Sequence, residues 1–90
     1  MIFRRSSFDR AYSRLTHQER QRVNLAVDRL EKSFGHPHEH GGLGIRSIGH
    51  FFECRAGLQI RVLFVVTGGD LILVTVGSHD AIRAYIKANS

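Results

Sequence analysis

Hydrophobic residues in the first half of the chain recur at helical spacing. The first apolar stripe occupies positions i, i+3, i+4 and i+7 and consists of Phe8, Ala11, Tyr12 and Leu15. This spacing predicts a short amphipathic helix, with Ser6 or Ser7 placed to cap its start. The three residues before it, Ile2–Arg4, are interpreted as a short edge strand.

A second helix is predicted to begin at Thr16, because residues 16–19 have the sequence T-x-x-E of a capping box. Its apolar stripe consists of Val23, Ala26, Val27, Leu30 and Phe34. Gly35 and Pro37 then end the helix, since neither residue continues helical geometry well. We expect the two helices to form an antiparallel hairpin.

The second half of the chain has a period closer to two, which is typical of strands. It follows a loop at residues 36–44 that contains three histidines, the only proline and three glycines. The predicted strands are Ile45–Ile48, Phe51–Arg55, Gln59–Thr67 and Leu71–Val76. Turns at residues 56–58 and 68–70 join them, so the four strands are expected to pair antiparallel in meander order.

A final helix is predicted from Ser78, which is placed to cap it, with Asp80 in its first turn. Its short apolar stripe consists of Ile82, Tyr85 and Ile86. The predicted fold class is therefore α+β, with an N-terminal helical hairpin, an antiparallel sheet and a short C-terminal helix. The length of 90 residues fits one domain, 1–90.

Strand alternation places three charged residues on one face of the predicted sheet. If Phe52 and Cys54 face the helices, Glu53 faces the other way together with Arg55. In the next strand, the row facing the helices is Ile60, Val62, Phe64 and Val66, which leaves Arg61 on the face of Glu53. The group is either an ordinary cross-strand ion pair or, because it has one cation more than it needs, a phosphate-binding site.

The charge balance favours an anionic partner. Thirteen Lys and Arg residues against eight Asp and Glu give a net charge of +5, and eleven of the thirteen are arginine. Arginine binds phosphate and carboxylate bidentately. Several arginines are nevertheless expected to form a solvated face, namely Arg10, Arg14, Arg20 and Arg29.

A single cysteine excludes an internal disulfide, and no apolar run is long enough for a signal or membrane span, so we expect a cytoplasmic protein.

His79 directly follows the most apolar strand, at the start of the final helix. Free backbone N–H groups and the helix dipole attract anions there, and a histidine can donate a proton near neutral pH. Its position alone favours a polar cap residue with no catalytic task. Tyr85 is expected to pack on the sheet, with contact to a substrate as the alternative.

The alternating histidines of the loop, His36, His38 and His40, lie beside Glu39. Such a cluster can chelate a transition metal, but adjacent loop ligands rarely reach one ion without strain, and no remote ligand is identifiable. No metal or other cofactor is therefore expected.

Taken together, these segments resemble the RelE/ParE toxins of bacterial toxin–antitoxin pairs. The resemblance lies in FDRAYSRLTHQERQRVNLAVDRLEKSF for the helical hairpin, HPHEHGGLGIRSIGHFFECRAGLQIRVLFVV for the strands and GGDLILVTVGSHDAIRAY for the end. The motif V-G-x-H-D is its most specific part. The resemblance implies a helical hairpin on a curved, mainly antiparallel sheet of four to five strands.

The RelE-like branch of this family cleaves messenger RNA, generally on the ribosome and without a metal. The resemblance implies Glu53 as base, His79 as acid, Arg55 and Arg61 as phosphate contacts, and Tyr85 as a further catalytic group. Arg46 and Arg22 are expected to bind the RNA. It also implies a cognate antitoxin as partner.

Two alternatives remain open within the same family. The stretch Leu43–Gly49 contains Arg46 but no lysine, whereas many ribosome-dependent members carry lysines there. ParE-like members inhibit DNA gyrase and need no nuclease site, and a purely regulatory relative would do neither.

Overall fold

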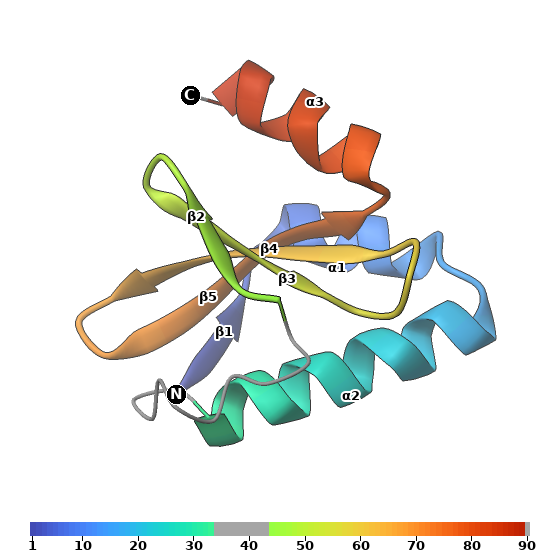
Figure 1. Ribbon diagram of the computed structural model, residues 1–90, viewed down its shortest axis with the longest axis horizontal. Coiled ribbons are helices and arrows are strands. Elements are labelled where there is room, and N and C mark those ends of the chain that lie inside the picture. Colours follow the sequence, from blue (N-terminus) through green and yellow to red (C-terminus); the bar gives the residue numbers. More distant parts are fainter. Residues whose placement is uncertain (34–43, 90) are drawn as a thin grey trace.

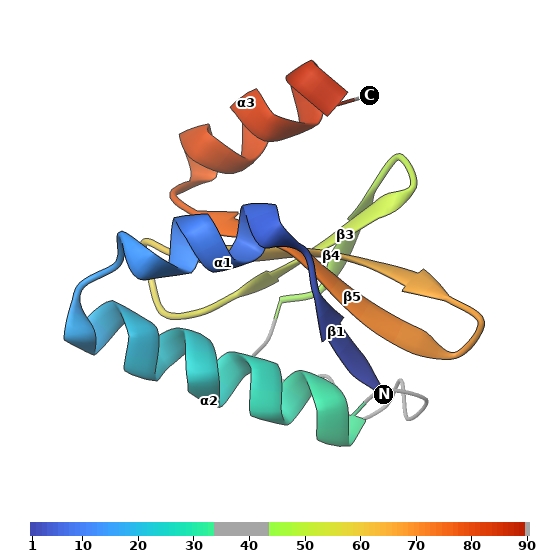
Figure 2. The same ribbon diagram turned by 180° about the vertical axis from the view of Figure 1, so that it is seen from behind.

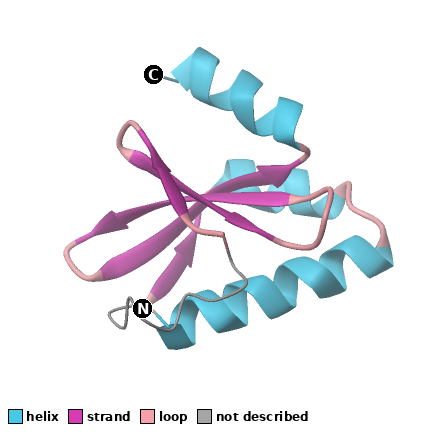
Figure 3. Cartoon of the chain, viewed as in Figure 1, coloured by secondary structure: helices cyan, strands magenta, loops and turns pink. Residues whose placement is uncertain are grey.

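The computed structural model describes residues 1–33 and 44–89, which form eight elements (Figure 1). In chain order these elements are β1 (Ile2–Arg4), α1 (Ser6–Ser13), α2 (His17–Ser33), β2 (Arg46–Ile48), β3 (Phe51–Arg55), β4 (Arg61–Thr67), β5 (Asp70–Gly77) and α3 (His79–Asn89). The strands make one five-stranded sheet in the order β1-β5-β4-β3-β2, with every pair antiparallel except β1 and β5 (Figure 3). The predicted α+β class, the helical hairpin and the mainly antiparallel sheet are confirmed.

The helices cover opposite faces of the sheet (Figures 1 and 2). α1 and α2 pack on one face, where their apolar stripes meet alternate residues of β3, β4 and β5, including Cys54, Val62 and Leu73. α3 lies on the other face, where Ile82 packs against a smaller apolar cluster that includes Leu63. These two faces are called the α2 face and the α3 face below.

The start of α2 has the predicted capping box. The backbone N–H of Thr16 donates to Glu19 Oε1 at 2.8 Å, and the backbone N–H of Glu19 donates to Thr16 Oγ1 at 3.2 Å. The predicted end of this helix, at Phe34, Gly35 and Pro37, lies outside the described residues.

The predicted cap of α1 is wrong. Arg5 occupies the cap position without a side-chain cap, because its backbone N–H extends the pairing of β1 with β5 by donating to Leu73 O at 2.9 Å. Ser7 instead lies inside the helix, and its hydroxyl donates to Val74 O at 2.5 Å. This bond ties α1 to the sheet.

The boundaries of three strands differ from the prediction. β5 extends one residue further at each end, as Asp70–Gly77. β4 begins at Arg61 rather than Gln59, because the backbone N–H of Ala56 donates to Ile60 O at 2.9 Å and closes residues 56–60 into a turn. β2 likewise begins at Arg46 rather than Ile45.

The predicted alternation is largely confirmed. Cys54, Val62 and Phe64 contribute to the core of the α2 face, whereas Leu63 contributes to that of the α3 face. Val66 is the exception: it is 39% exposed because it lies near the turn after β4, outside both apolar clusters.

Arg20 differs from the solvated arginine that was expected. Its guanidinium donates to Tyr12 O at 3.3 Å and to Ser13 O at 2.6 Å, and it lies 5.7 Å from the centroid of the Tyr12 ring. These contacts satisfy carbonyls at the end of α1, so Arg20 stabilises the turn between the two helices.

In the described segments, 1–33 and 44–89, no helix combines the length and the apolar character needed to cross a lipid bilayer.

Candidate active site

A pocket of about 250 Å³ opens on the α3 face, between the edge strand β2 and α3. Its lining residues are Arg46, Ile48, Glu53, His79, Arg83, Ile86 and Lys87. We call it the His79 pocket. Its charged groups are three cations and one carboxylate, so its field favours an anion.

Glu53 is the buried centre of this pocket. Its side chain is 5% exposed, and its Oε1 lies 3.3 Å from Arg46 Nε and 3.8 Å from Arg61 Nε. Arg46 is the cross-strand partner of Glu53 on β2, and Arg61 comes from β4 on the other side of β3. The predicted grouping of Glu53 with an arginine is confirmed, but one of its two arginine partners is Arg46 rather than Arg55.

Several buried polar atoms of this cluster lack a hydrogen-bond partner among the described residues. They are Glu53 Oε2, Arg61 Nε and Arg61 Nη1. Buried polar groups without partners are rare, because each one carries the free-energy cost of its lost hydration. Two unsatisfied guanidinium donors next to a positively charged pocket are suited to an anionic oxygen.

His79 reaches the pocket because β5 leads into α3 through a tight connection. Ser78 Oγ accepts the Ala81 N–H at 3.1 Å, which confirms the predicted cap. A Cβ at Gly77 would lie 3.1 Å from Ala81 Cβ, so glycine lets the helix start close to the strand. The imidazole is therefore held at the first position of α3, and the side chain is exposed at the pocket mouth.

Two cations of the pocket were missed in the sequence analysis. Arg83 and Lys87 follow His79 at steps of four residues, so the three side chains lie on one stripe of α3. The spacing of four residues between His79, Arg83 and Lys87 is the sequence signal that indicates this stripe.

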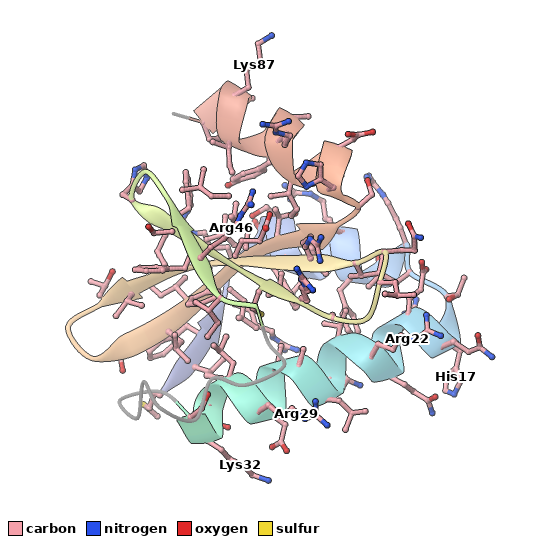
Figure 4. All side chains as sticks on the ribbon, viewed as in Figure 1. His17, Arg22, Arg29, Lys32, Arg46 and Lys87 are labelled. Carbon is pink, nitrogen blue, oxygen red and sulfur yellow. The ribbon has the colours of Figure 1, made fainter. Side chains whose placement is uncertain are left out.

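Arg55 and Arg22 lie elsewhere. They line a second hollow, of about 140 Å³, on the side of the sheet where α2 packs. Its lining residues are Arg22, Leu25, Ala26, Arg29, Arg55, Ala56 and Gly57. We call it the arginine pocket. Figure 4 shows Arg22 and Arg29 on α2 and Arg46 on β2.

Tyr85 packs on the sheet, as expected, instead of reaching over it. Its half-buried ring meets Phe51 edge-on, with 6.3 Å between centroids, and it belongs to the apolar cluster of the α3 face. It does not line the His79 pocket. A catalytic role for Tyr85 stays a prediction.

Cys54, the residue after Glu53, is buried on the α2 face. Burial, and secondly the charge of Glu53, raise the pKa of this thiol to about 12. The thiol is therefore unsuited to act as a nucleophile.

Residues 1–33 and 44–89 contain no cluster of three potential metal ligands, and the loop histidines His36, His38 and His40 lie outside them.

Comparison with known proteins identifies the class of fold. No protein-family profile matches the chain, and no curated protein sequence matches it. Solved structures do: the chain has the fold of RelE-type toxins.

The matching structures include toxins in complex with antitoxins. The RelB–RelE complex of Methanococcus jannaschii matches with a TM-score of 0.71 at 19% identity, covering 92% of this chain and 96% of that one. The RelE–RelB complex of Pyrococcus horikoshii has a TM-score of 0.66 at 15% identity, with coverages of 86% and 91%. The DinJ–YafQ complex of E. coli has 0.66 at 13% identity, with coverages of 91% and 96%.

Proposed function

We propose that this chain is the toxin of a toxin–antitoxin pair and that it inhibits translation as a metal-independent endoribonuclease acting on messenger RNA, in association with the ribosome in the cytoplasm. The observation that carries the proposal is the pair of buried, unsatisfied guanidinium donors of Arg61 beside a basic pocket that also holds His79 and Glu53. The RelE-type fold supports it.

The proposed reaction is phosphodiester transfer within RNA. A base removes the proton of a 2′-hydroxyl, whose oxygen attacks the adjacent phosphorus while the bond to the 5′-oxygen breaks. The leaving oxygen takes a proton, and the upstream fragment ends in a 2′,3′-cyclic phosphate. Atoms and charge balance without any further reactant.

The roles follow from position. His79, exposed at the pocket mouth, protonates the 5′-oxygen. Glu53 is the candidate base, and its Oε2 is the oxygen left without a hydrogen bond among the described residues. Arg61 stabilises the charge on the phosphoryl oxygens, with Arg46 and Arg83 as the nearest further cations of the pocket. Arg55 stays a predicted phosphate contact, but it lines the arginine pocket rather than this one.

The cognate antitoxin is the proposed protein partner. Similar structures include the RelB–RelE antitoxin–toxin complex and the DinJ–YafQ complex. A net charge of +5 favours acidic segments in such a partner.

The test is the fate of growth and transcripts after induction. His79→Ala and Arg61→Ala should each remove growth arrest, because a positioned general acid contributes about 10²- to 10⁴-fold and a charge-stabilising donor a comparable factor. Messenger RNA ends within coding sequence, mapped after induction of the wild type, should disappear with either variant.

A matched control is available in His17→Ala. His17 is the first residue of α2 after its cap, as His79 is of α3, and it is likewise exposed. This variant should arrest growth like the wild type. Full arrest by folded His79→Ala would refute the assignment, and DNA breaks with intact transcripts would establish a gyrase inhibitor instead.

A further inference from the structure

The arginine pocket joins three guanidinium groups from two elements. Arg22 and Arg29 are seven residues apart on α2, which places them on one face of the helix, and Arg55 ends β3. None of the described residues that line it is acidic. Among the described residues, none of the three arginines forms an ion pair. The hollow thus concentrates positive charge without a carboxylate, unlike the His79 pocket.

Two glycines fix the position of these arginines. A Cβ at Gly57 would lie 3.0 Å from Arg22 Cδ, and one at Gly44 would lie 2.9 Å from Arg55 Nε. Both glycines have positive φ, +87° and +58° respectively. The two arginine side chains therefore pass close to glycine backbone, where the side chain of any other residue would displace them.

The arginine pocket is linked to the His79 pocket through the sheet. Arg55 is the direct cross-strand partner of Arg61, whose Nε lies 3.8 Å from Glu53 Oε1. The β3–β4 hairpin therefore contributes Arg55 to the arginine pocket and Arg61 to the charged cluster around Glu53.

The chemistry of the hollow favours phosphate over a protein segment. A volume of about 140 Å³ suits a small tetrahedral anion. Protein interfaces have an apolar centre with aromatic anchors, whereas Leu25 is the one large apolar side chain among the described residues that line this hollow. Arginine forks match phosphate geometry bidentately.

We propose that the arginine pocket is a second phosphate-binding site, which holds the backbone of a single-stranded RNA outside the His79 pocket. This inference rests on the proposed function for its ligand. It assigns Arg29, expected to be a solvated residue, to RNA binding, and it moves Arg22 and Arg55 from the site of cleavage to this second site.

Binding can be measured apart from cleavage. The probe is a 5′-fluorescein-labelled single-stranded RNA with 2′-O-methyl groups at every ribose, which lacks the attacking hydroxyl. Fluorescence anisotropy gives the dissociation constant of the purified full-length chain at several salt concentrations. The test variant is Arg22→Ala with Arg29→Ala. Both side chains are exposed on α2 and alanine has a high helix propensity, so the variant should remain folded.

The double variant should bind the probe about tenfold more weakly, since a charged hydrogen bond contributes about that factor or more. The slope of log K against log salt should fall by about 0.7, because one phosphate contact on a single strand is lost. The matched control is Arg10→Ala with Arg14→Ala, which removes the same charge from exposed positions in α1 and at its C-cap. It should change binding less than twofold.

Each other outcome has a defined meaning. Equal weakening by the control pair would show nonspecific attraction and overturn the site. Unchanged RNA binding by the test pair would overturn it too, and loss of antitoxin binding in that variant would assign the pocket to acidic protein. If the wild type binds RNA through the pocket but cleaves none, the proposed function fails and the site stands.

Discussion

The two faces of the sheet differ in what they bury. On the α2 face, two helices cover the larger apolar core, with side chains such as Val23, Leu30 and Val62 at 0–1% exposure. On the α3 face, one helix covers a smaller apolar cluster, and beside it the sheet buries Glu53 against Arg61. The same strands supply both faces, so the difference arises from alternate residues.

This difference separates stability from chemistry. The α2 face buries apolar surface, the main favourable contribution to folding. The α3 face keeps charged groups partly dehydrated, which costs free energy but holds them ready for an anion. Mutations on the two faces should therefore have different consequences.

The largest loss of stability should come from the α2 face. Leu30→Ala should lower the free energy of unfolding by about 3 kcal/mol, because a fully buried leucine leaves a cavity. Urea denaturation measures the change. Leu25→Ala, on the same helix but 59% exposed, should change it by less than about 0.5 kcal/mol. Equal stability of the two variants would contradict the described orientation of α2.

A smaller loss is expected at the charged cluster of the α3 face. Glu53→Ala should destabilise by about 2 kcal/mol, because the Arg61 guanidinium then loses its nearby carboxylate; the partial exposure of Arg61 moderates the effect. Glu31→Ala, an exposed carboxylate of α2, should have no measurable effect. A Glu53→Ala variant as stable as the wild type would mean that Glu53 is not needed to balance Arg61.

The smallest change in stability is expected for the helix caps, of which only the cap of α3 should also affect cleavage. Ser78→Ala and Thr16→Ala each remove a cap and should each cost about 1 kcal/mol in thermal or urea unfolding. Only Ser78→Ala should also slow RNA cleavage, because Ser78 fixes the start of α3 and with it His79. Equal cleavage rates in the two variants would show that His79 does not depend on this cap.

Local signals were sufficient to predict most of the fold. The capping box at Thr16 and the cap at Ser78 depend on residues three positions apart, and both are present. The cap of α1 was mispredicted because the bond from Arg5 to Leu73 joins residues far apart in sequence. Alternation likewise placed Glu53 and Arg61 on one face. It did not predict that Arg46 and residues of α3 surround Glu53 there.

The site was predicted less completely for the same reason. The pairing of Arg46 with Glu53 requires the register of β2 on β3, and three residues of strand do not determine that register. Arg55 shares a face with Glu53 by alternation, yet at the end of β3 its side chain packs against the position of Gly44. Strand periodicity gives no information about such a terminal side chain.

The parallel pairing of β1 with β5 has a consequence for how the chain acquires its structure. Ile2 pairs with Leu71 across 69 positions of sequence. β1 therefore has no partner strand until nearly the whole chain is available, so its pairing closes a very long loop and contributes to a high contact order. α1 can form early but can be anchored only afterwards, through Ser7 and the carbonyl of Val74. His79 follows the same strand β5, so the pairing of β1 and the completion of the His79 pocket depend on one segment.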